Sequence, residues 1–271
     1  MKSSLMIDVS PNYSITFPFE EKHDPKAVQQ WFAENWHLSL YFSVVYLILV
    51  FSGKEYMKKR EAFKLRKLLV LWNVFLAVFS IFGAFRTLPE MFHVLSNYGF
   101  DHSACNPSYA EQVKVSAFWT WLFTLSKIPE LGDTLFVILR KQSLQLLHWY
   151  HHVTVFLFCW YSYPEHFSTA RWSVCMNYTV HAVMYSYYAI RAIGYRPPRW
   201  TAMLITMAQT TQMIVGLGVN GYAFHRKING HYCNCEMRTL FWALLMYASY
   251  FVLFARYFYF AYFSKERTKK D

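Results

Sequence analysis

Seven long apolar blocks constrain the fold of this chain more than any other feature. A helix that crosses the hydrocarbon core of a bilayer needs about 20 residues, and soluble proteins do not carry seven such runs in succession. The composition agrees, because 55% of the residues are hydrophobic and only 16% are charged. The sequence therefore predicts an all-α, polytopic membrane protein with seven transmembrane helices. The blocks cover residues 38–53, 68–85, 115–139, 144–163, 172–190, 201–223 and 239–263.

The chain is expected to form one membrane-embedded domain over residues 1–271, because no linker or internal repeat divides it. A short N-terminal segment, about 1–35, precedes the first span, and a short tail, about 264–271, follows the last. The first 35 residues have no continuous apolar run, so no cleavable signal is expected there. The first span would then act as the targeting signal.

The net charge of +11 indicates which connections face the cytosol. Of the 27 Lys and Arg residues, 16 fall in only 36 positions, which are 54–67, 140–143, 191–200 and the tail 264–271. Cytosolic loops of membrane proteins are enriched in Lys and Arg. These segments are therefore predicted to be cytosolic, which places the N-terminus in the lumen and the C-terminus in the cytosol. The charge is a topological signal, and nucleic-acid binding is not expected.

Two short motifs bear on localisation. The tail carries basic residues at Arg267 and Lys269, an arrangement that resembles the dibasic retrieval signal of endoplasmic-reticulum membrane proteins. An ordinary basic stop after the last span would look the same, and both interpretations stay open. Asn12 begins an Asn-Tyr-Ser acceptor on the predicted lumenal side, which makes it a candidate glycosylation site.

Cysteines on the predicted lumenal side allow one disulfide. Cys105 lies in the second lumenal connection, and Cys233 and Cys235 lie in the last. An oxidising lumen would allow a bridge from Cys105 to either partner, and the sequence does not choose between them. The cysteine spacing matches no zinc site.

Polar and ionisable residues inside the apolar blocks are costly in a membrane and therefore mark candidate functional sites. Most of them lie about 7–17 Å from the predicted cytosolic ends of their spans, counted along the helices. One common layer predicts an internal chamber that opens to the cytosol. Its candidate members are Lys127, Glu130, Asp133, His148, His151, His152, Asn177, His181, Gln209, Gln212 and Arg256.

Some of these residues also have a purely structural interpretation. Lys127, Glu130 and Asp133 recur at three-residue steps on one helix face and could form an ion-pair ladder that lets the helix insert. Gln209 and Gln212 could form interhelical hydrogen bonds of the kind common in membranes. His181 taken alone fits a structural or a catalytic histidine equally well.

Three histidines within five residues, His148, His151 and His152, point to chemistry. One option is iron ligation with Glu130 or Asp133, as in metal-dependent membrane desaturases and hydroxylases. Those lipid oxidases use several HxxHH boxes and more histidines than the spans of this chain supply. A single mononuclear metal site stays open. So does a seven-span receptor or transporter, although one histidine-rich layer argues against it.

The other option is nucleophilic catalysis by imidazole. Burial disfavours the charged form of histidine, and a neutral imidazole can attack an activated acyl group such as a thioester. A second histidine could move a proton, and a neutral donor such as Asn177 could hold a developing oxyanion. A long apolar interior suits a fatty chain, and a basic mouth suits a phosphate-rich carrier.

Four sequence blocks resemble the signature blocks of the very-long-chain fatty acid elongases, and they occur in the order of that family. They are Lys-Ile-Pro-Glu-Leu-Gly-Asp-Thr at 127–134, His-Trp-Tyr-His-His at 148–152, residues 176–188 around Asn177 and His181, and residues 206–212. The sequence of the histidine box is similar to that found in the branch of the family that acts on saturated and monounsaturated acyl-CoAs. The similarity covers nearly the whole chain.

The resemblance implies a fold and an activity. Six of the seven helices would form a barrel around an acyl-chain tunnel in the endoplasmic-reticulum membrane. The enzyme would condense a long-chain acyl-CoA with malonyl-CoA, without a metal or cofactor, to give a 3-oxoacyl-CoA, CO₂ and CoA. A ketoreductase, a dehydratase and an enoyl reductase would be its partners in the elongation cycle. The oligomeric state is left open, a homo-oligomer included.

The resemblance also assigns roles to residues. His151 matches the proposed nucleophile of the family, which forms an acyl-imidazole. His181 would assist the malonyl step, and His148 and His152 would orient and polarise. The remaining signature positions would contact substrate or form the pocket wall. These are Lys127, Glu130, Asp133, Asn177, Gln209 and Gln212.

Overall fold

All seven apolar blocks are helical in the computed structural model, which describes residues 9–263. Within that range all the regular structure is helical, as predicted. Block 115–139 alone is split, at Leu131 and Gly132. The helices are α1 (Pro18–Glu21), α2 (Pro25–Asn35), α3 (Leu38–Lys58), α4 (Arg66–Cys105), α5 (Ser108–Glu111), α6 (Lys114–Glu130), α7 (Asp133–Leu139), α8 (Leu146–Ser162), the 3₁₀ helix η1 (Tyr163–Glu165), α9 (Ala170–Ile193), α10 (Arg199–Ile228) and α11 (Met237–Tyr262).

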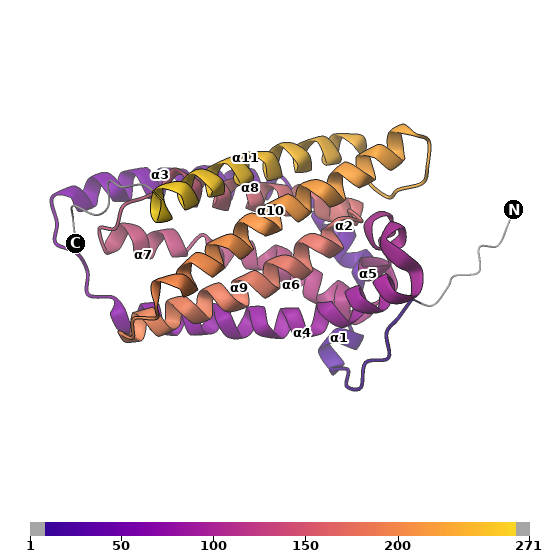
Figure 1. Cartoon of the computed structure of the whole chain (residues 1–271), viewed down its shortest axis with the longest axis horizontal. Helices are drawn as coiled ribbons and strands as arrows, with labels where there is room; N and C mark the ends of the chain where they lie inside the picture. The colour runs from indigo at the N-terminus through magenta and orange to yellow at the C-terminus, as the bar shows by residue number, and fades with distance from the viewer. Residues whose placement is uncertain (1–8, 264–271) are drawn as a thin grey trace, which may run out of the picture.

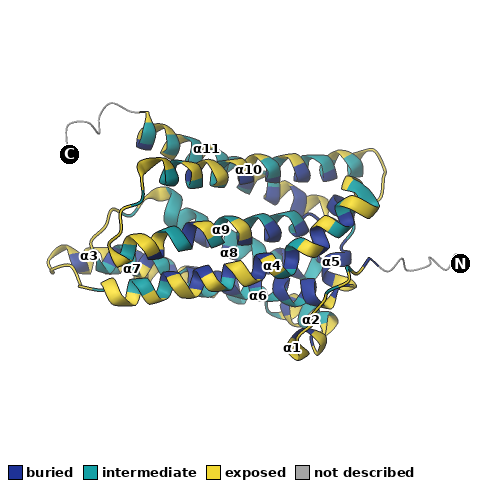
Figure 2. Ribbon diagram, turned by 60° about the horizontal axis from the view of Figure 1, so that its bottom comes forward, coloured by how far each residue is buried: buried dark blue, intermediate teal, exposed yellow. Residues whose placement is uncertain are grey.

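Four helices in the described part of the chain, α3, α4, α10 and α11, are long and apolar enough to cross a membrane. Their outer faces expose large apolar side chains, and such faces suit lipid contact. Figure 2 shows the exposed positions along α4 in yellow. These helices support a multi-pass membrane protein. α6 and α8 have 17 residues each, and α6, α8 and α9 carry the polar residues that lower their hydropathy. The count of seven spans and the barrel therefore stay predictions.

The long helices run along the long axis of the molecule (Figure 1). α4 and α9 lie side by side, and Gly83 makes this close approach possible, because a Cβ there would collide with the Tyr178 ring. Gly216 of α10 likewise allows α11 to approach closely, because a Cβ at this position would collide with the Tyr247 ring. Glycine at these two positions lets an aromatic ring of one helix lie directly on the backbone of the next.

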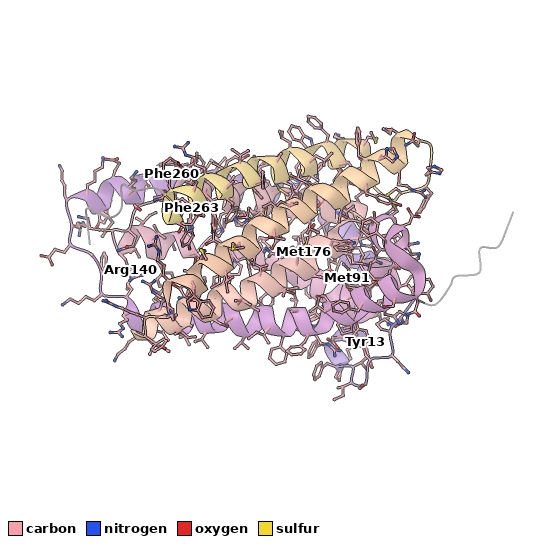
Figure 3. The ribbon with its side chains drawn as sticks, in the orientation of Figure 1. Tyr13, Met91, Arg140, Met176, Phe260 and Phe263 are labelled. Carbon is pink, nitrogen blue, oxygen red and sulfur yellow. A yellow bond between two sulfur atoms is a disulfide. The ribbon has the colours of Figure 1, made fainter. Side chains whose placement is uncertain are left out.

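The three basic connections that are predicted to be cytosolic lie together at one end of the molecule. Lys141 Nζ donates to Arg60 O at 3.0 Å, and Arg66 Nε donates to Ala192 O at 2.8 Å. Arg140 marks the same end in Figure 3. The predicted retrieval signal in the tail lies outside the described residues. That this end faces the cytosolic side of the membrane stays a prediction.

The opposite end holds the disulfide. Cys105, the last residue of α4, is bonded to Cys233 in the loop between α10 and α11, 128 residues further on. Cys235 is a buried free thiol, 3.0 Å from Ser168 Oγ. Asn12 is exposed in an irregular segment. The structure thus selects one of the two disulfide pairings that the sequence allowed. The candidate glycosylation site at Asn12 is accessible.

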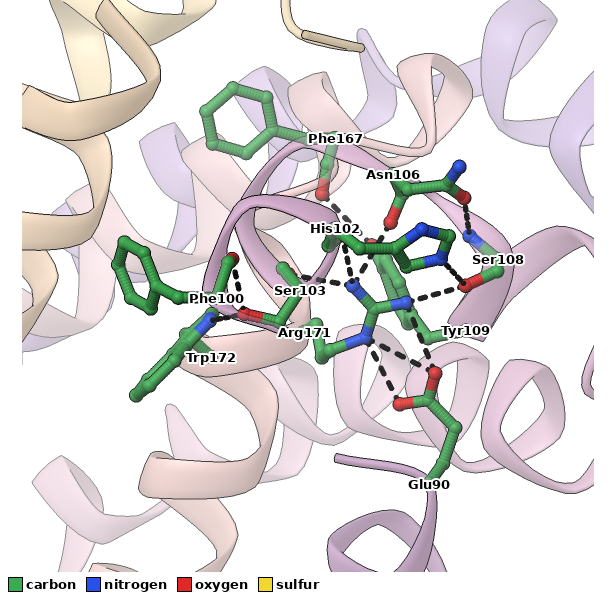
Figure 4. A network of polar contacts seen from close by, with 10 residues as sticks. All are labelled: Glu90, Phe100, His102, Ser103, Asn106, Ser108, Tyr109, Phe167, Arg171 and Trp172. Carbon is green, nitrogen blue, oxygen red and sulfur yellow. Dashed lines mark hydrogen bonds and ion pairs between the residues drawn. The ribbon is translucent and has the colours of Figure 1, made fainter. Parts of the chain in front are cut away.

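A buried ion pair holds this end together (Figure 4). Arg171 of α9 donates to both carboxylate oxygens of Glu90, at 3.0–3.1 Å, and both side chains are fully buried. The guanidinium also donates to Ser103 O at 2.6 Å, Asn106 O at 3.0 Å and Ser108 Oγ at 2.7 Å. It therefore satisfies carbonyls that the end of α4 leaves open and fixes α5 beside α9.

We expect Arg171→Leu to lower the free energy of unfolding by about 3–5 kcal/mol, because it leaves Glu90 as an unpaired buried carboxylate. Thermal unfolding in detergent measures the effect. The double variant with Glu90→Leu should be more stable than Arg171→Leu alone. Arg238→Leu is the control, since its pair with Glu236 is exposed and such pairs contribute about 1 kcal/mol or less. Equal losses for the buried and exposed arginines would contradict the assignment.

Candidate functional site

A chamber of about 820 Å³ lies among α8, α9, α10 and α11, with Asp133 of α7 in its wall. Three arginines line its mouth: Arg191 near the end of α9, Arg196 in the loop that follows and Arg199 at the start of α10. This mouth lies at the end of the molecule where the basic connections gather. The structure brings together in this wall eight of the ten site residues that the sequence predicts: Asp133, His148, His151, His152, Asn177, His181, Gln209 and Gln212.

Three candidates of the polar layer lie elsewhere. Lys127 and Glu130 are buried behind the chamber wall, with 2% and 3% of their surfaces exposed. Arg256 is exposed, and its guanidinium lies 5.7 Å from the Phe260 ring centroid. The prediction that Arg256 belongs to the chamber is therefore wrong. α11 turns other positions inward, Phe254 and Tyr257 among them.

A chain of contacts joins α6 to α9 behind the wall. Lys127 Nζ lies 2.7 Å from Glu130 Oε1 and donates to Asn177 Oδ1 at 3.2 Å. The amide nitrogen of Asn177 then faces His181 Nε2 at 3.2 Å, and His181 Nδ1 lies 4.0 Å from Glu130 Oε1. Because the ammonium fixes the amide oxygen, the amide nitrogen must donate to Nε2. The network thus assigns the proton of neutral His181 to Nδ1, toward the carboxylate.

The ion-pair interpretation of α6 holds for only part of the ladder. Lys127 and Glu130 form the pair, whereas both oxygens of Asp133 are taken by neutral donors. Trp72 Nε1 donates to Oδ1 at 2.6 Å, and Tyr185 OH donates to Oδ2 at 2.8 Å. The chain turns between α6 and α7 directly beside these two hydrogen bonds. Asp133 therefore joins α4, α7 and α9 at the chamber wall.

His148 is held from the side of α3. Its Nε2 lies 3.0 Å from Thr134 Oγ1, and that hydroxyl lies 2.7 Å from Tyr46 OH. The His148 ring stands edge-on to His152, with 4.6 Å between the ring centroids. Over residues 9–263, no group of three His, Cys, Asp or Glu side chains has the arrangement of a metal site.

His151 occupies the junction of two cavities. Its ring lies 4.9 Å from the Tyr250 ring, and its nitrogens have no hydrogen-bond partner among the described residues. Four residues, His151, Asn177, Gln212 and Met213, line both the chamber and a second, narrow cavity. An unpartnered imidazole at this junction is free to react with a group that passes between the cavities.

The narrow cavity leads away from the basic end. It follows one face of α8 from His151 to Ser162, a distance of about 16 Å along the helix axis. It ends beside α5 and η1, at Tyr109, Tyr163 and His166. Its volume is about 70 Å³, so a long chain enters only if side chains such as Met213 change rotamer. Its middle is lined mostly by apolar side chains: Phe123, Val155, Phe158, Cys159, Val174 and Met246.

Sequence reasoning did not assign roles to several residues that hold the site. These are Trp72 and Tyr185 on Asp133, Tyr46 and Thr134 on His148, and Tyr250 beside His151. Aromatic residues are so frequent in the spans that the sequence alone predicts only a packing role for them. Only Tyr185 carried a usable signal, because it lies one helical turn after His181.

Helices of membrane-spanning character surround a histidine-lined chamber, which continues into the narrow apolar cavity. These features define a membrane protein suited to a lipid-like substrate. Residues 31–270 match the sequence model of the GNS1/SUR4 family, ELO. The chain belongs to this family.

Its relatives are named as elongases. The chain is 50% identical over 258 residues to very long chain fatty acid elongase 6 of Drosophila melanogaster, which covers 94% of this chain and 82% of that protein. It is 48% identical over 251 residues to very long chain fatty acid elongase 6 of Homo sapiens, with 93% and 94% covered. Very long chain fatty acid elongase 3 of Homo sapiens is 41% identical over 234 residues, with 86% of each chain covered. The resemblance in the four blocks is thereby confirmed at the level of the family.

We expect Asp133→Asn to destabilise the protein by about 1–3 kcal/mol. The substitution replaces one carboxylate oxygen, which accepts a hydrogen bond, by an NH₂ group, and this group would face the N–H of Trp72 or the hydroxyl of Tyr185. Tyr185→Phe removes one hydrogen bond without this conflict and should cost about 1 kcal/mol. Thermal unfolding of both variants and of the double variant measures the coupling. Additive losses would show that Asp133 and Tyr185 do not share a hydrogen bond.

Proposed function

We propose that this fatty acid elongase family member catalyses the condensation of a long-chain acyl-CoA with malonyl-CoA. The observation that carries the proposal is the place of His151, where a basic-mouthed chamber meets a narrow apolar cavity. The acyl chain would occupy the narrow cavity and the CoA portion the chamber. The thioester carbonyl, which joins the two, would then lie at the imidazole. The two thioesters and the side chains supply the whole chemistry, without a metal or cofactor.

The first step transfers the acyl group to His151. A neutral ring nitrogen attacks the thioester carbonyl, the C–N bond forms, and the C–S bond breaks. CoA leaves as a thiolate and takes up the proton that the imidazole loses. His148 and His152 orient the reacting ring and polarise the carbonyl, and the amide groups of Gln209 and Gln212 form the polar wall.

The second step uses malonyl-CoA. Loss of CO₂ leaves an electron pair on the carbon next to the thioester, and that carbon attacks the acyl-imidazole carbonyl. As the new C–C bond forms, the C–N bond to His151 breaks, and the departing ring nitrogen takes up a proton from water in the chamber, which regenerates neutral His151 and gives a 3-oxoacyl-CoA. The Asn177 amide stabilises the enolate oxygen of malonyl-CoA with its second N–H, and His181 assists this step by accepting the first N–H and so holding the amide in place. Lys127 and Glu130 support both groups through the contacts described above.

The basic mouth suits the phosphates of CoA. Arg191 and Arg199 each have a hydrogen bond to the protein, to Tyr187 OH at 3.1 Å and Ala261 O at 3.0 Å. Arg196 has no such partner among the described residues and lies in the loop between α9 and α10. A guanidinium group in that position is free to bind a phosphate.

The wider setting is proposed on the same basis. The protein would form one domain with seven spans, six of them in a barrel, in the endoplasmic-reticulum membrane. The basic end would face the cytosol, and the end with Cys105–Cys233 the lumen. The sequence of the histidine box, His-Trp-Tyr-His-His, favours saturated and monounsaturated acyl-CoAs as substrates. A ketoreductase, a dehydratase and an enoyl reductase would process the product.

Purified protein that is given palmitoyl-CoA and radiolabelled malonyl-CoA should form labelled 3-oxoacyl-CoA. Palmitoyl-CoA alone should leave an acyl adduct on His151, detectable by mass spectrometry of peptides. His151→Ala should lose the adduct and at least about 10³-fold of the activity, since removal of a covalent catalyst leaves only positioning effects. Trp149→Phe, outside the chamber on the same helix, is the control. Condensation at the wild-type rate by His151→Ala would refute the covalent role.

We expect Arg196→Ala to raise KM for palmitoyl-CoA by roughly tenfold, the value of one charge-assisted hydrogen bond of about 1.5 kcal/mol, with little change in kcat. Palmitoyl-pantetheine, which lacks the nucleotide, should not distinguish the variant from wild type. Arg226→Ala, near Asp101 at the opposite end, serves as the control. Equal effects on both thioesters would mean that Arg196 does not contact the nucleotide portion of CoA.

A further inference from the structure

His166 is an unusual residue at the far end of the narrow cavity. It follows η1 with a left-handed backbone, at φ 47°, which non-glycine residues seldom adopt. Only 4% of its surface is exposed, and both ring nitrogens are buried without a hydrogen bond in the part of the chain that the structure describes. Such an arrangement costs free energy twice, in backbone conformation and in lost hydrogen bonds.

Other polar groups beyond the junction with the chamber lie toward this end of the cavity. Thr120 Oγ1, another lining atom, is also buried without a hydrogen bond among residues 9–263. Ser162, 6% exposed, lines the same end. Outside the cavity lining, Glu111 Oε1 lies 3.5 Å from His166 Nδ1. Hydroxyl and imidazole groups therefore surround the place where a hydrocarbon chain would stop.

The polar groups along the middle of the cavity differ, because they already have partners. Tyr247 OH lies 2.7 Å from Ser173 Oγ, and Tyr250 OH lies 2.6 Å from Thr154 Oγ1. These hydroxyls present only ring carbons and satisfied oxygens to a bound chain. Beyond the junction at His151, the open hydrogen-bonding capacity of the cavity therefore lies at its far end, about 16 Å along α8.

We propose that His166 forms a polar binding site for the terminal group of an acyl chain, and that it accepts chains with a hydroxyl on their last carbon. A terminal hydroxyl can donate to one ring nitrogen and accept from Ser162 or Thr120. A terminal methyl group leaves all these groups unpaired, which disfavours a hydrocarbon chain that reaches the same depth. The site would therefore recognise ω-hydroxyacyl-CoAs of one particular length.

The test compares matched pairs of substrates on the whole protein and rests on the proposed function. Each ω-hydroxyacyl-CoA from decanoyl to stearoyl is assayed for elongation beside its unsubstituted partner, and the ratio of their kcat/KM values is plotted against length. We expect the ratio to pass through a maximum at the length that reaches His166, about tenfold above its value for the shorter chains, as one added hydrogen bond would give. A ratio that falls steadily or stays flat with length would overturn the proposal.

Three variants locate the effect. His166→Leu should abolish the maximum, whereas His166→Asn should retain part of it, because Asn tolerates a left-handed backbone and still forms hydrogen bonds. Phe158→Leu is the matched control, since Phe158 lines the same cavity without a polar group. It should change the rates of both substrates together and leave the maximum in place. Retention of the maximum by a folded His166→Leu would contradict the assignment to His166.

Two further measurements keep the test decisive. If His166→Leu does not fold, as judged by thermal unfolding, the wild-type length series alone decides. If no unsubstituted acyl-CoA is elongated, the proposed function fails. The same substrate pairs are then compared by displacement of a fluorescent acyl-CoA. A maximum in relative affinity at one length would still support the polar site, and its absence would refute it.

Discussion

Polar groups that lie away from water must find partners inside the protein, and this constraint shapes the whole structure. Arg171 satisfies it with Glu90 and with carbonyls at the end of α4. Lys127 satisfies it with Glu130 and Asn177. Each of these cations connects helices that are far apart in the sequence. The same buried contacts that make the polar residues tolerable also determine how α4, α5, α6 and α9 are placed.

The site depends on this placement. α8 supplies the histidine box, α9 supplies Asn177 and His181, and α10 supplies the two glutamines. α6 contributes no group to the chamber wall, yet its ion pair determines which way the Asn177 amide points. Residues behind the wall thus define which ring nitrogen of His181 carries the proton. The basic mouth lies at the end where three connections are tied together by contacts between Lys141 or Arg66 and backbone carbonyls.

Helix content and the chamber could be predicted from the sequence because both depend on local patterns. Block lengths identified the helices, and the spacing of His148, His151 and His152 identified one face. The outward direction of Arg256 could not be predicted, because it depends on the rotation of α11 against its neighbours. The same is true of Trp72 on Asp133, which joins residues 61 positions apart. Cys105 had two equivalent partners in sequence, and only the path of the last loop selects Cys233.

The narrow cavity runs from His151 to α5 and has its polar end there. An acyl chain that occupied it from the chamber, as proposed above, would leave by the same route. Departure then requires every buried methylene group to return to water or lipid. Against water, each one slows release by about fourfold, the equivalent of about 0.8 kcal/mol. A product two carbons longer than its precursor would remain bound roughly fifteen times longer on this scale. Under the proposed function, the residence time of the product would therefore rise with its own length.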